Sequence, residues 1–299
     1  MPGAGLVISS DIEHETSFSS DLLRKWRQRF GFPNYEQASD GKCGYSRETI
    51  NQLILVKRLL DAGFRPAQIV GKTLPELERL RREFGENRTA PSWSEPTQRL
   101  LDQLKRNDLI GLHRLLSSDR ATKTLTEFVV DTLAPLVIAV GEAWSREELA
   151  VFQEHVVTSA IQRLLHAELA TLKPRNGLPR FLFTTVPDEH HSLGLLMAEA
   201  VLADQGVTHI NLGANTPLSE INSAAKAWQA DVVAVSFSFA YPSRKVRPTL
   251  VHLRRLLPKH IELWSGGAGV TVIRRPHKGV RVFTDLKDSI SLLPYFTKH

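Results

Sequence analysis

Short apolar runs alternate with longer amphipathic segments through residues 178–299. The short runs are rich in Val, Ile, Phe and Leu, as buried strands are, whereas the longer segments repeat apolar residues at helical spacing. The predicted strands lie near 180–186, 208–213, 231–238, 261–266 and 280–284, and the predicted helices near 194–205, 217–229, 244–257 and 286–295. Such alternation predicts a parallel sheet with helices on both faces. We therefore expect an α/β domain with a five-stranded, Rossmann-like (flavodoxin-like) parallel sheet.

Strand signals are scarce between residues 97 and 173, where apolar residues recur every three or four positions. Four helical segments are expected, near 97–106, 107–117, 122–144 and 146–172. Four helices with short connections favour an antiparallel four-helix bundle. We expect Pro135 to kink or restart the third helix. The stretch Ser145-Arg146-Glu147-Glu148 has the pattern of a capping box that would begin the fourth.

The first 75 residues have the pattern of a small helical domain. Two short helices are expected over residues 8–17 and 19–30, with Ser19 or Ser20 as the cap of the second. Its apolar stripe consists of Leu22, Leu23, Trp26 and Phe30, and its outer faces carry Arg24, Lys25, Arg27 and Arg29. A basic helix face suits the major groove of DNA, although a merely solvated face explains the same charges equally well.

Residues 47–70 continue this domain, and the residues after them no longer show a regular apolar pattern. Residues 47–61 carry a broad apolar face that predicts the domain's central helix, and Pro66 opens a shorter one. Residues 72–88 alternate in charge and predict a helical or mobile connector. Pro, Ser and Ala dominate residues 90–96, which is typical of a linker. We place the connector at residues 76–96, between a domain at 1–75 and the bundle at 97–173.

Composition narrows the class of protein. Of the 299 residues, 42% are hydrophobic, and no apolar run approaches the length of a membrane span. The N-terminus lacks a secretory pattern, so we expect a cytoplasmic protein with no membrane partner. A single cysteine, Cys43, excludes an internal disulfide and a multi-cysteine zinc site. The net charge of +6 permits a polyanionic partner without requiring one.

Chemically distinctive residues lie at the carboxyl ends of three of the predicted strands. They are Glu189, His191 and Gly194 after the first, Ser236 and Ser238 at the end of the third, and Gly266 and Gly267 at the end of the fourth. The carboxyl ends of parallel strands share one edge, where ligands of such sheets bind. A metal-bound imidazole usually donates its second N–H to a carboxylate, which Glu189 could supply to His191. A solvated polar loop remains the alternative on these residues alone.

The bundle offers a second group of candidates. Trp144 is followed, after nine residues, by Glu154 and His155. Without further context, Trp144 could simply close the end of the bundle while Glu154 and His155 lie on a solvated face.

The strand-end residues together resemble the cobalamin-binding signature of methionine synthase and related proteins. Forty-one residues separate Gly194 from Ser236, and twenty-seven separate Ser238 from Gly266. The resemblance implies that His191, rather than His190, replaces the lower ligand of the cobalt. It also implies that the serine contacts the displaced nucleotide tail and that Gly266 and Gly267 leave room for it. Two departures are Ser238, where a larger aliphatic residue is more usual, and Glu189, where the methyltransferases carry aspartate.

Residues 23–33, the triplet Gly44-Tyr45-Ser46 and the helix from Arg47 resemble the winged helix-turn-helix DNA-binding domain of MerR-type regulators. In that family the second helix reads the major groove and the wing touches the DNA backbone. Tyr45 matches the tyrosine of the family's wing motif Arg-x-Tyr. Cys43 takes the place of the arginine, whose charge Lys42 could supply instead. We interpret Cys43 as an exposed wing residue rather than a redox sensor.

The order of the three parts resembles the CarH/LitR family of photoreceptor repressors over nearly the whole chain. That family carries Glu-x-His-x-x-Gly below the cobalt and Trp-x9-Glu-His above it, and both patterns are present here. The resemblance implies that Trp144 packs against the adenosyl group of adenosylcobalamin, with Glu154 near that group. It further implies that His155 could approach the cobalt from above once that group leaves, while His191 holds it from below.

The function implied by this resemblance is that of a repressor rather than an enzyme. Bound to adenosylcobalamin in the dark, the protein would form a homo-oligomer on double-stranded promoter DNA, and it would release that DNA in light. Two alternatives stay open. One is a MerR-type regulator that is independent of cobalamin or senses another ligand. The other is a cobalamin carrier module of a methyltransferase or mutase, against which the DNA-binding domain and the lack of a substrate domain argue.

Overall fold

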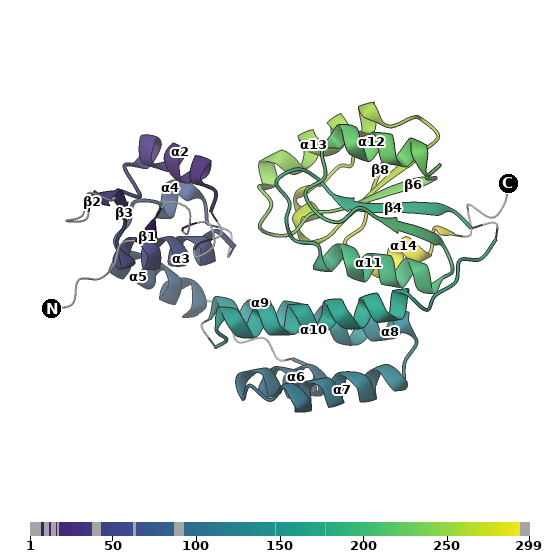
Figure 1. The fold of residues 1–299 in the computed structure, drawn as a ribbon, viewed down its shortest axis with the longest axis horizontal. Helices are drawn as coiled ribbons and strands as arrows, with labels where there is room; N and C mark the ends of the chain where they lie inside the picture. The colour runs from purple at the N-terminus through teal and green to yellow at the C-terminus, as the bar shows by residue number, and fades with distance from the viewer. Residues whose placement is uncertain are drawn as a thin grey trace. The chain divides into compact units, whose positions relative to one another are not determined.

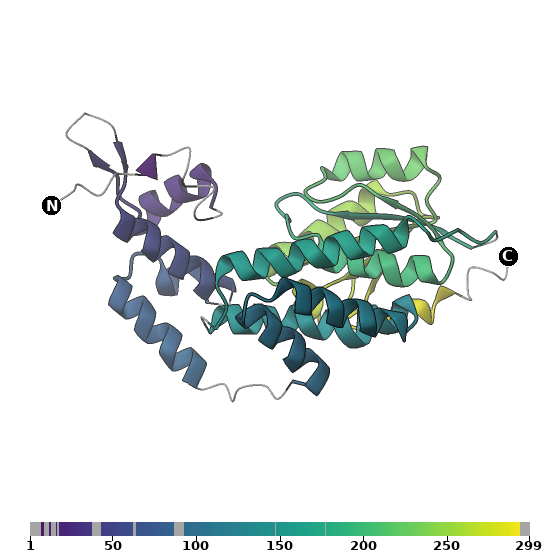
Figure 2. The same cartoon turned by 60° about the horizontal axis from the view of Figure 1, so that its bottom comes forward.

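A computed structural model describes residues 7–8, 12, 16, 18–37, 43–61, 64–86, 93–146, 148–176 and 178–293. The chain divides into two compact units, Met1–Ser92 and Trp93–His299, and each is described by itself (Figure 1, Figure 2). In the part of the chain that the structure describes, no helix combines the length and the apolar character needed to cross a membrane.

The first unit is a small helical domain with a three-stranded sheet. Its elements are β1 (Val7–Ile8), α2 (Ser20–Phe30), β2 (Glu36–Gln37), β3 (Cys43–Tyr45), α3 (Arg47–Asp61), α4 (Pro66–Ile69) and α5 (Leu74–Glu86). Strand β3 lies between β1 and β2 and pairs antiparallel with both. Ser19 caps α2 as predicted, because its hydroxyl accepts a hydrogen bond from the amide of Leu22. The predicted apolar stripe of α2 faces the core, in which Leu23 and Trp26 are buried.

Of two expectations for this unit, the first needs correction, and the second is confirmed in that the charged segment is helical. Ile8 belongs to β1, where it pairs with Gly44, and does not begin a helix. The pairing with β3 supplies backbone partners that a sequence pattern over ten residues cannot reveal. The charged segment after Lys72 contains α5, and Leu77 of that helix is fully buried in the core formed with α3. Its alternating charges therefore belong to a helix packed within the first unit.

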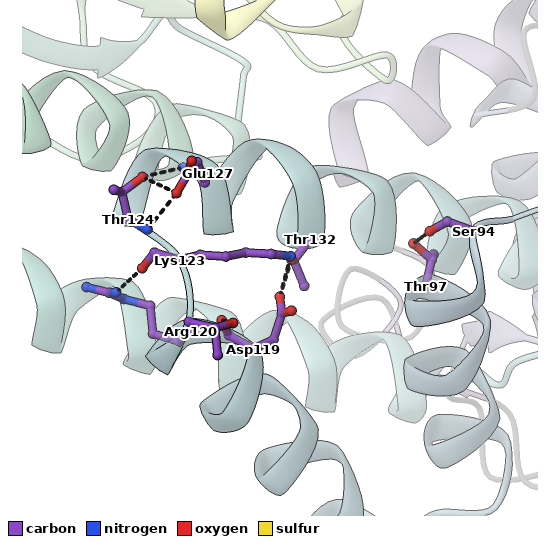
Figure 3. Close-up of polar contacts among 9 residues, drawn as sticks. Ser94, Thr97, Asp119, Arg120, Lys123, Thr124, Glu127 and Thr132 are labelled. Atoms are coloured by element: carbon purple, nitrogen blue, oxygen red, sulfur yellow. Dashed lines mark hydrogen bonds and ion pairs between the residues drawn. The ribbon is translucent and has the colours of Figure 1, made fainter.

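The second unit begins with a four-helix bundle. Its elements are α6 (Glu95–Lys105), α7 (Leu109–Ala121), α8 (Leu125–Phe128), the π-helical turn η1 (Val129–Leu133), α9 (Ala134–Ser145) and α10 (Val151–Leu169). The segments α8, η1 and α9 follow one another without a break and form the third helix of the bundle. Thr124 caps it in a reciprocal pair with Glu127 (Figure 3).

The π-helical turn ends two residues before Pro135, which was predicted to disturb this helix. Proline has no N–H to donate to the preceding turn, and a wider turn accommodates the loss. Within this turn the buried Thr132 accepts a hydrogen bond from Lys123 at 2.7 Å, and Lys123 also pairs with Asp119 at 2.9 Å. The hydroxyl of Thr132 donates to Asp119 in turn (Figure 3). This network fixes η1 to the end of α7.

The predicted start of the fourth helix is wrong. Ser145 is the last residue of α9, and α10 begins at Val151. The amide of Glu148 bonds to the carbonyl of Ala143, which turns the chain back after α9. The side chain of Gln153 then accepts the free amide of Ala150 at 2.7 Å, so the cap lies five residues beyond the predicted one.

The α/β part completes the second unit. Its elements are β4 (Arg180–Thr185), α11 (Leu193–Asp204), β5 (Thr208–Asn211), α12 (Leu218–Ala227), β6 (Val232–Ser236), α13 (Ser243–Leu256), β7 (Glu262–Gly266), the short 3₁₀ helix η2 (Ala268–Val272), β8 (Val280–Val282) and α14 (Leu286–Ile290). The strands are all parallel, in the order β5-β4-β6-β7-β8. This is the predicted flavodoxin-like order, whose switch point lies between β4 and β6.

Helix α11 is shared between the sheet and the bundle (Figure 1). Leu195 and Leu202 face the sheet core, whereas Leu196 and Val201 belong to the bundle core. A helix with apolar residues on every side, such as α11, is buried on every side. Helices α12 and α13 cover the opposite face of the sheet, where Ile221 joins its other core. The bundle therefore packs against the α/β domain through the buried helix α11, and Leu286 and Ile290 of α14 add to this contact.

Candidate functional site

The candidate residues meet at the carboxyl ends of β4 and β6, the two strands that flank the switch point. These strands are paired in register, so that Thr185 lies opposite Ser236. The loop after β4 carries Glu189 and His191. Ser238, in the loop after β6, contacts Glu189. The topology therefore brings together residues separated by about fifty positions in the sequence, as the strand-end pattern predicts.

Glu189 is the centre of a buried hydrogen-bond cluster, with 1% of its surface exposed. Its Oε1 accepts both the backbone N–H and the ring Nδ1 of His191, each at 2.9 Å. Its Oε2 accepts the backbone N–H of Ser238 at 2.7 Å and the Ser238 hydroxyl at 2.8 Å. These donors come from two different loops, so the carboxylate joins the ends of β4 and β6.

The electrostatics of the cluster keep Glu189 ionised. Burial acts to raise the pKa of this carboxyl, but the hydrogen bonds from His191 and Ser238 outweigh burial and lower the pKa below its ordinary value. A carboxylate is an acceptor only, so the Nδ1 of His191 must carry the proton that it donates. In the neutral ring, the other nitrogen, Nε2, then keeps a free lone pair.

His191 presents this nitrogen outward, because 58% of its side chain is exposed although its partner Glu189 is buried. A buried carboxylate that fixes the tautomer of a histidine is the usual arrangement behind a metal ligand. His190 is also exposed but has no such partner among the described residues. Of the two histidines, His191 is therefore the one held by a buried carboxylate.

The set of donors suits a metal already held by an organic ring. His191 supplies one nitrogen, as an axial ligand does for a macrocycle-bound metal. Among the residues that the structure describes, no three His, Cys, Asp or Glu side chains gather in a way that could hold a bare ion. A corrin-bound cobalt therefore fits the site.

Ser236 and its glycine neighbours form a second part of the site. The Ser236 hydroxyl has no hydrogen-bond partner within the described chain, although the residue is only 7% exposed. A Cβ at Gly194 would lie 3.6 Å from this hydroxyl, and one at Gly267 would lie 2.9 Å from it. Gly267 also has a φ of +91°, which side-chain-bearing residues rarely adopt. A free hydroxyl between two glycines matches the place predicted for the nucleotide tail.

The structure also identifies residues that the sequence interpretation missed. A Cβ at Gly269 would lie 2.5 Å from the carbonyl oxygen of Ser238, so η2 can pack against that loop only with glycine there. Thr185 donates its hydroxyl to the carbonyl of Glu189 and accepts the amide of Asn215 at 2.8 Å. The run Gly266-Gly267-Ala268-Gly269 was a visible signal for Gly269, whereas nothing in the sequence pointed to Thr185 or Asn215.

Ser238, which stands where a larger aliphatic residue is more usual, contacts both the histidine and its carboxylate. Its hydroxyl lies 3.2 Å from the Nδ1 of His191 as well as within hydrogen-bond distance of Glu189. It therefore supports the histidine and its carboxylate. Gly266 is in ordinary surroundings, where a Cβ would lie 3.6 Å from the carbonyl of Phe283.

The second group of candidates lies at the end of α9 and the start of α10. Trp144 is partly buried, Glu154 accepts the hydroxyl of Thr158 at 2.9 Å, and 71% of the His155 side chain is exposed. The chain passes from the end of α10 to the start of β4, and Arg175 in this link bonds to Gly206 just after α11. The final turns of α10 and α11 therefore lie at the same end, and the two helices run in the same direction.

The lengths of these helices place Glu154 and His155 near the carboxyl edge of the sheet. Helix α10 has 19 residues and α11 has 12. At about 1.5 Å per residue, α10 is longer by roughly 10 Å and extends past the first turn of α11. Glu154 and His155 lie on this extension, next to the end of the domain that carries His191. The structure thus brings both groups to one edge of the sheet.

The basic residues of α2 differ in their surroundings. Arg24 and Lys25 are exposed and both pair with Asp21, and Arg29 lies over the ring of Phe30. Arg27 is partly buried instead. It donates to the carbonyl of Pro33 and to the hydroxyl of Tyr45, each at 2.8 Å, and lies 3.9 Å from the centre of the Tyr35 ring.

Tyr45 is not an exposed wing residue, since only 2% of its surface is accessible. Burial, with a further contribution from the hydrogen bond with Tyr35, raises its pKa to about 12. Tyr45 therefore supports Arg27 rather than presenting its hydroxyl to a phosphate, which corrects the expectation from the sequence. Cys43 is exposed as predicted, and Lys42 lies outside the described residues.

Comparison with known protein families agrees with these three parts. Residues 9–73 match the MerR HTH family regulatory proteins. Residues 97–167 and 179–283 match two models that both carry the description B12 binding domain. The bundle and the α/β domain together thus correspond to the cobalamin-binding part of the chain.

Known proteins resemble the chain over most of its length. The HTH-type transcriptional repressor CarA of Myxococcus xanthus is 27% identical over 76% of this chain and 74% of its own. A monomethylamine corrinoid protein from Methanosarcina barkeri superposes with a TM-score of 0.49 at 16% identity, over 64% of this chain and 94% of its own. That superposition is too loose to add to the assignment.

The full-length resemblance decides the family. The HTH-type transcriptional repressor CarH of Myxococcus xanthus is 30% identical over 274 residues, which are 87% of each chain. CarH and CarA are both repressors, so the task of such a chain is regulatory rather than enzymatic. The chain belongs to the CarH-like family of cobalamin-binding transcriptional repressors, with a MerR-type DNA-binding domain.

Proposed function

We propose that this protein is a light-responsive repressor that binds adenosylcobalamin and promoter DNA in the dark and releases the DNA on illumination. The observation that carries the proposal is the meeting of two groups at one edge of the sheet. His191 faces outward from the end of β4, and the extension of α10 brings Glu154 and His155 to the same end. When bound, adenosylcobalamin supplies a cobalt–carbon bond that visible light breaks.

The residues at the sheet edge, His191 with Glu189, Ser238 and Ser236, hold and orient the cofactor from below. His191 offers Nε2 to the cobalt, while Glu189 and Ser238 keep its ring in one tautomer and one orientation. The free hydroxyl of Ser236 binds the displaced nucleotide tail between Gly194 and Gly267. These residues lie at the ends of paired strands, so the site is largely formed before the cofactor arrives.

The bundle residues Trp144, Glu154 and His155 make the site sensitive to the adenosyl group, which would lie on the side of the cobalt opposite His191. Trp144 packs against the adenosyl group and Glu154 lies near it. His155 is largely exposed, lies 3.7 Å from the carboxylate of Glu154, and would be the residue to approach the cobalt from above once that group had left. Because α10 also packs on α11, a change at its first turns reaches the core shared by bundle and sheet.

Oligomerisation is the proposed link between cofactor and DNA. In the dark several copies assemble, so that their DNA-binding units occupy repeated half-sites with a gain in effective concentration. After illumination the copies separate, and each unit alone makes too few phosphate contacts to stay bound at physiological salt.

The test measures the visible absorption spectrum, the molecular mass in solution and the DNA affinity of one sample before and after green light. The full-length protein is purified with adenosylcobalamin in the dark, and binding is measured on a duplex taken from upstream of its own gene. We expect an oligomer that binds DNA in the dark, and smaller species with weaker binding after light. Retention of cobalamin with no light-dependent change in size or DNA binding would contradict the photoreceptor function. Failure to retain cobalamin would contradict it as well.

A matched pair of variants tests the ligand assignment. His191→Ala removes the proposed lower ligand, whereas His190→Ala removes its exposed neighbour, which has no partner within the described chain. We expect His191→Ala to weaken cobalamin retention and change the cobalt absorption spectrum, and His190→Ala to leave both unchanged. Equal effects of the two substitutions would show that His191 is not the ligand.

A further inference from the structure

Positive charge is concentrated in one segment of the α/β domain and not in the DNA-binding unit. Residues 237–281 hold ten Lys and Arg residues against a single acidic residue, Glu262, which gives a formal charge of +9. Residues 1–92 hold fourteen Lys and Arg against twelve Asp and Glu, which gives only +2. The whole chain carries +6, so this one segment exceeds the total. Charge asymmetry of this size points to a polyanionic partner.

Three of the ten cations are engaged within the protein. Lys245 pairs with Asp188 at 2.9 Å, and Arg281 pairs with Glu262 at 2.8 Å. Arg254 donates to the backbone carbonyls of its own surroundings, including that of Leu257 at 2.9 Å, and burial lowers its pKa. These three cations contact groups of the domain itself, and seven of the ten remain.

Helix α13 and the segment just after it carry four of the remaining cations. They are Arg244, Arg247, Arg255 and Lys259, all exposed. The spacing of the three arginines places them on one side of the helix, opposite the buried Val246 and Leu253. None of the four has an acidic partner within 4.0 Å in the described chain. Their charge is therefore not neutralised by the protein.

The segment after η2 adds three more cations beside the same helix. They are Arg274, Arg275 and Lys278, which are exposed and likewise have no acidic partner within the described residues. Helix η2 packs on α13, and Ile273 joins the core beneath that helix. A Cβ at Gly279 would lie 3.2 Å from Cδ of Arg254. The seven cations thus form one surface, which we call the α13 surface.

The composition of this surface favours phosphate over a protein partner. Five of its seven cations are arginines, whose planar guanidinium groups match phosphate oxygens in two-point contacts. Hot spots of protein interfaces also use arginine, but together with exposed Trp and Tyr anchors. Residues 237–281 are all described, and their one exposed aromatic side chain is Phe239, in the loop after β6 that carries Ser238. The α13 surface itself therefore has no aromatic anchor.

We propose that the α13 surface binds the phosphate backbone of DNA, in addition to the contacts made by the MerR-type unit. The surface lies on the face of the sheet away from α11 and the bundle, so it does not use the residues assigned to cobalamin (Figure 1). Its contacts are independent of base sequence, because they are made to phosphates. They add affinity that a DNA-binding unit of charge +2 does not supply alone. The inference holds whether or not the protein responds to light.

The test compares two charge-matched triple variants of the full-length protein, kept with cobalamin in the dark. One is Arg255→Glu/Arg274→Glu/Arg275→Glu on the α13 surface. The control is Arg106→Glu/Arg114→Glu/Lys173→Glu, which changes three exposed cations of the bundle and its link by the same amount. Binding to a duplex of arbitrary sequence is measured by fluorescence anisotropy between about 50 and about 200 mM NaCl. Cobalamin absorbance and molecular mass in solution are recorded for every sample.

The α13 variant should bind DNA more weakly than the control and show a smaller slope of log K against log [NaCl]. The slope should fall by about 0.9 for each phosphate that the variant no longer neutralises, hence by between about 1 and 3 in total. Equal slopes for the two variants would overturn the proposal. A lower slope accompanied by a changed molecular mass would overturn it too, because the α13 surface would then be an interface between copies of the chain.

Discussion

At the scale of single residues, the buried carboxylate of Glu189 controls the presentation of His191. Glu189→Gln keeps the shape of the side chain but replaces one acceptor oxygen by an NH₂ group, which cannot accept from His191 or Ser238. Loss of such support behind a metal ligand typically weakens metal affinity by about 10- to 100-fold. We expect a decrease of that size in cobalamin affinity, measured by absorbance titration.

A second buried pair in the same domain provides the control for this substitution. Glu199 is 4% exposed and binds the Nδ1 of His209 at 2.8 Å, outside the candidate site. Glu199→Gln should destabilise the fold in a comparable way but leave cobalamin affinity unchanged. If both variants lost affinity equally, the effect would come from the fold and not from His191.

The lowered pKa of Glu189 also predicts a pH dependence. Because the carboxyl has a lower pKa in the folded protein than in the unfolded chain, its ionisation stabilises the fold above the ordinary value of 4.5. This contribution is lost as the pH falls through the folded-state pKa. The difference in free energy of unfolding between wild type and Glu189→Gln should therefore narrow as the pH is lowered from about 7 to about 3. Urea denaturation at a series of pH values measures it, and a difference that widened toward low pH would contradict the assignment.

The residues that could be predicted from the sequence are those whose position follows from a strand end. His191, Ser236 and Gly267 all lie at or just after the carboxyl ends of strands of one parallel sheet, so their convergence follows from topology. Tyr45 could not be placed in this way. Its burial depends on the pairing of β3 with both β1 and β2, and on Arg27, eighteen residues away. Ser238 was recognised as unusual, but its bond to Glu189 needed the register of β6 beside β4.

At the scale of elements, α11 determines how bundle and sheet pack together. Ala200 is fully buried on the side of α11 that belongs to the bundle core. Ala200→Leu adds three carbons to a packed interface, which typically costs about 1–3 kcal/mol. We expect the free energy of unfolding of the second unit to fall by that amount in chemical denaturation. Ala227→Leu, at the exposed end of α12, is the control and should change stability little. A tolerated Ala200→Leu would mean that α11 is not tightly packed against the bundle.

Whether a segment is a helix or a strand was easier to predict than the residue at which it begins. The strands and helices of the α/β part were recognised because their apolar periods differ and persist over many residues. The start of α10 was wrong because Ser145 has the right residue type for a cap, while the actual cap uses the side chain of Gln153. Residue type alone cannot distinguish the two, since the choice depends on the turn made by Glu148 after α9.

At the scale of the whole molecule, the two compact units each have their own core. All residues assigned to cobalamin lie in the second unit, so the cofactor should stabilise that unit alone. Binding stabilises a folded unit by about 2.7 kcal/mol when the free ligand is at about 100 times its Kd. Differential scanning calorimetry in the dark should therefore show two transitions, of which adenosylcobalamin raises only one. In His191→Ala that shift should shrink or vanish, while the other transition stays in place. If cobalamin raised both transitions together, cofactor binding would be coupled to the stability of the DNA-binding unit within a single chain. Dependence of the shifted transition on protein concentration would then separate this coupling from the proposed oligomerisation, because only assembly follows mass action.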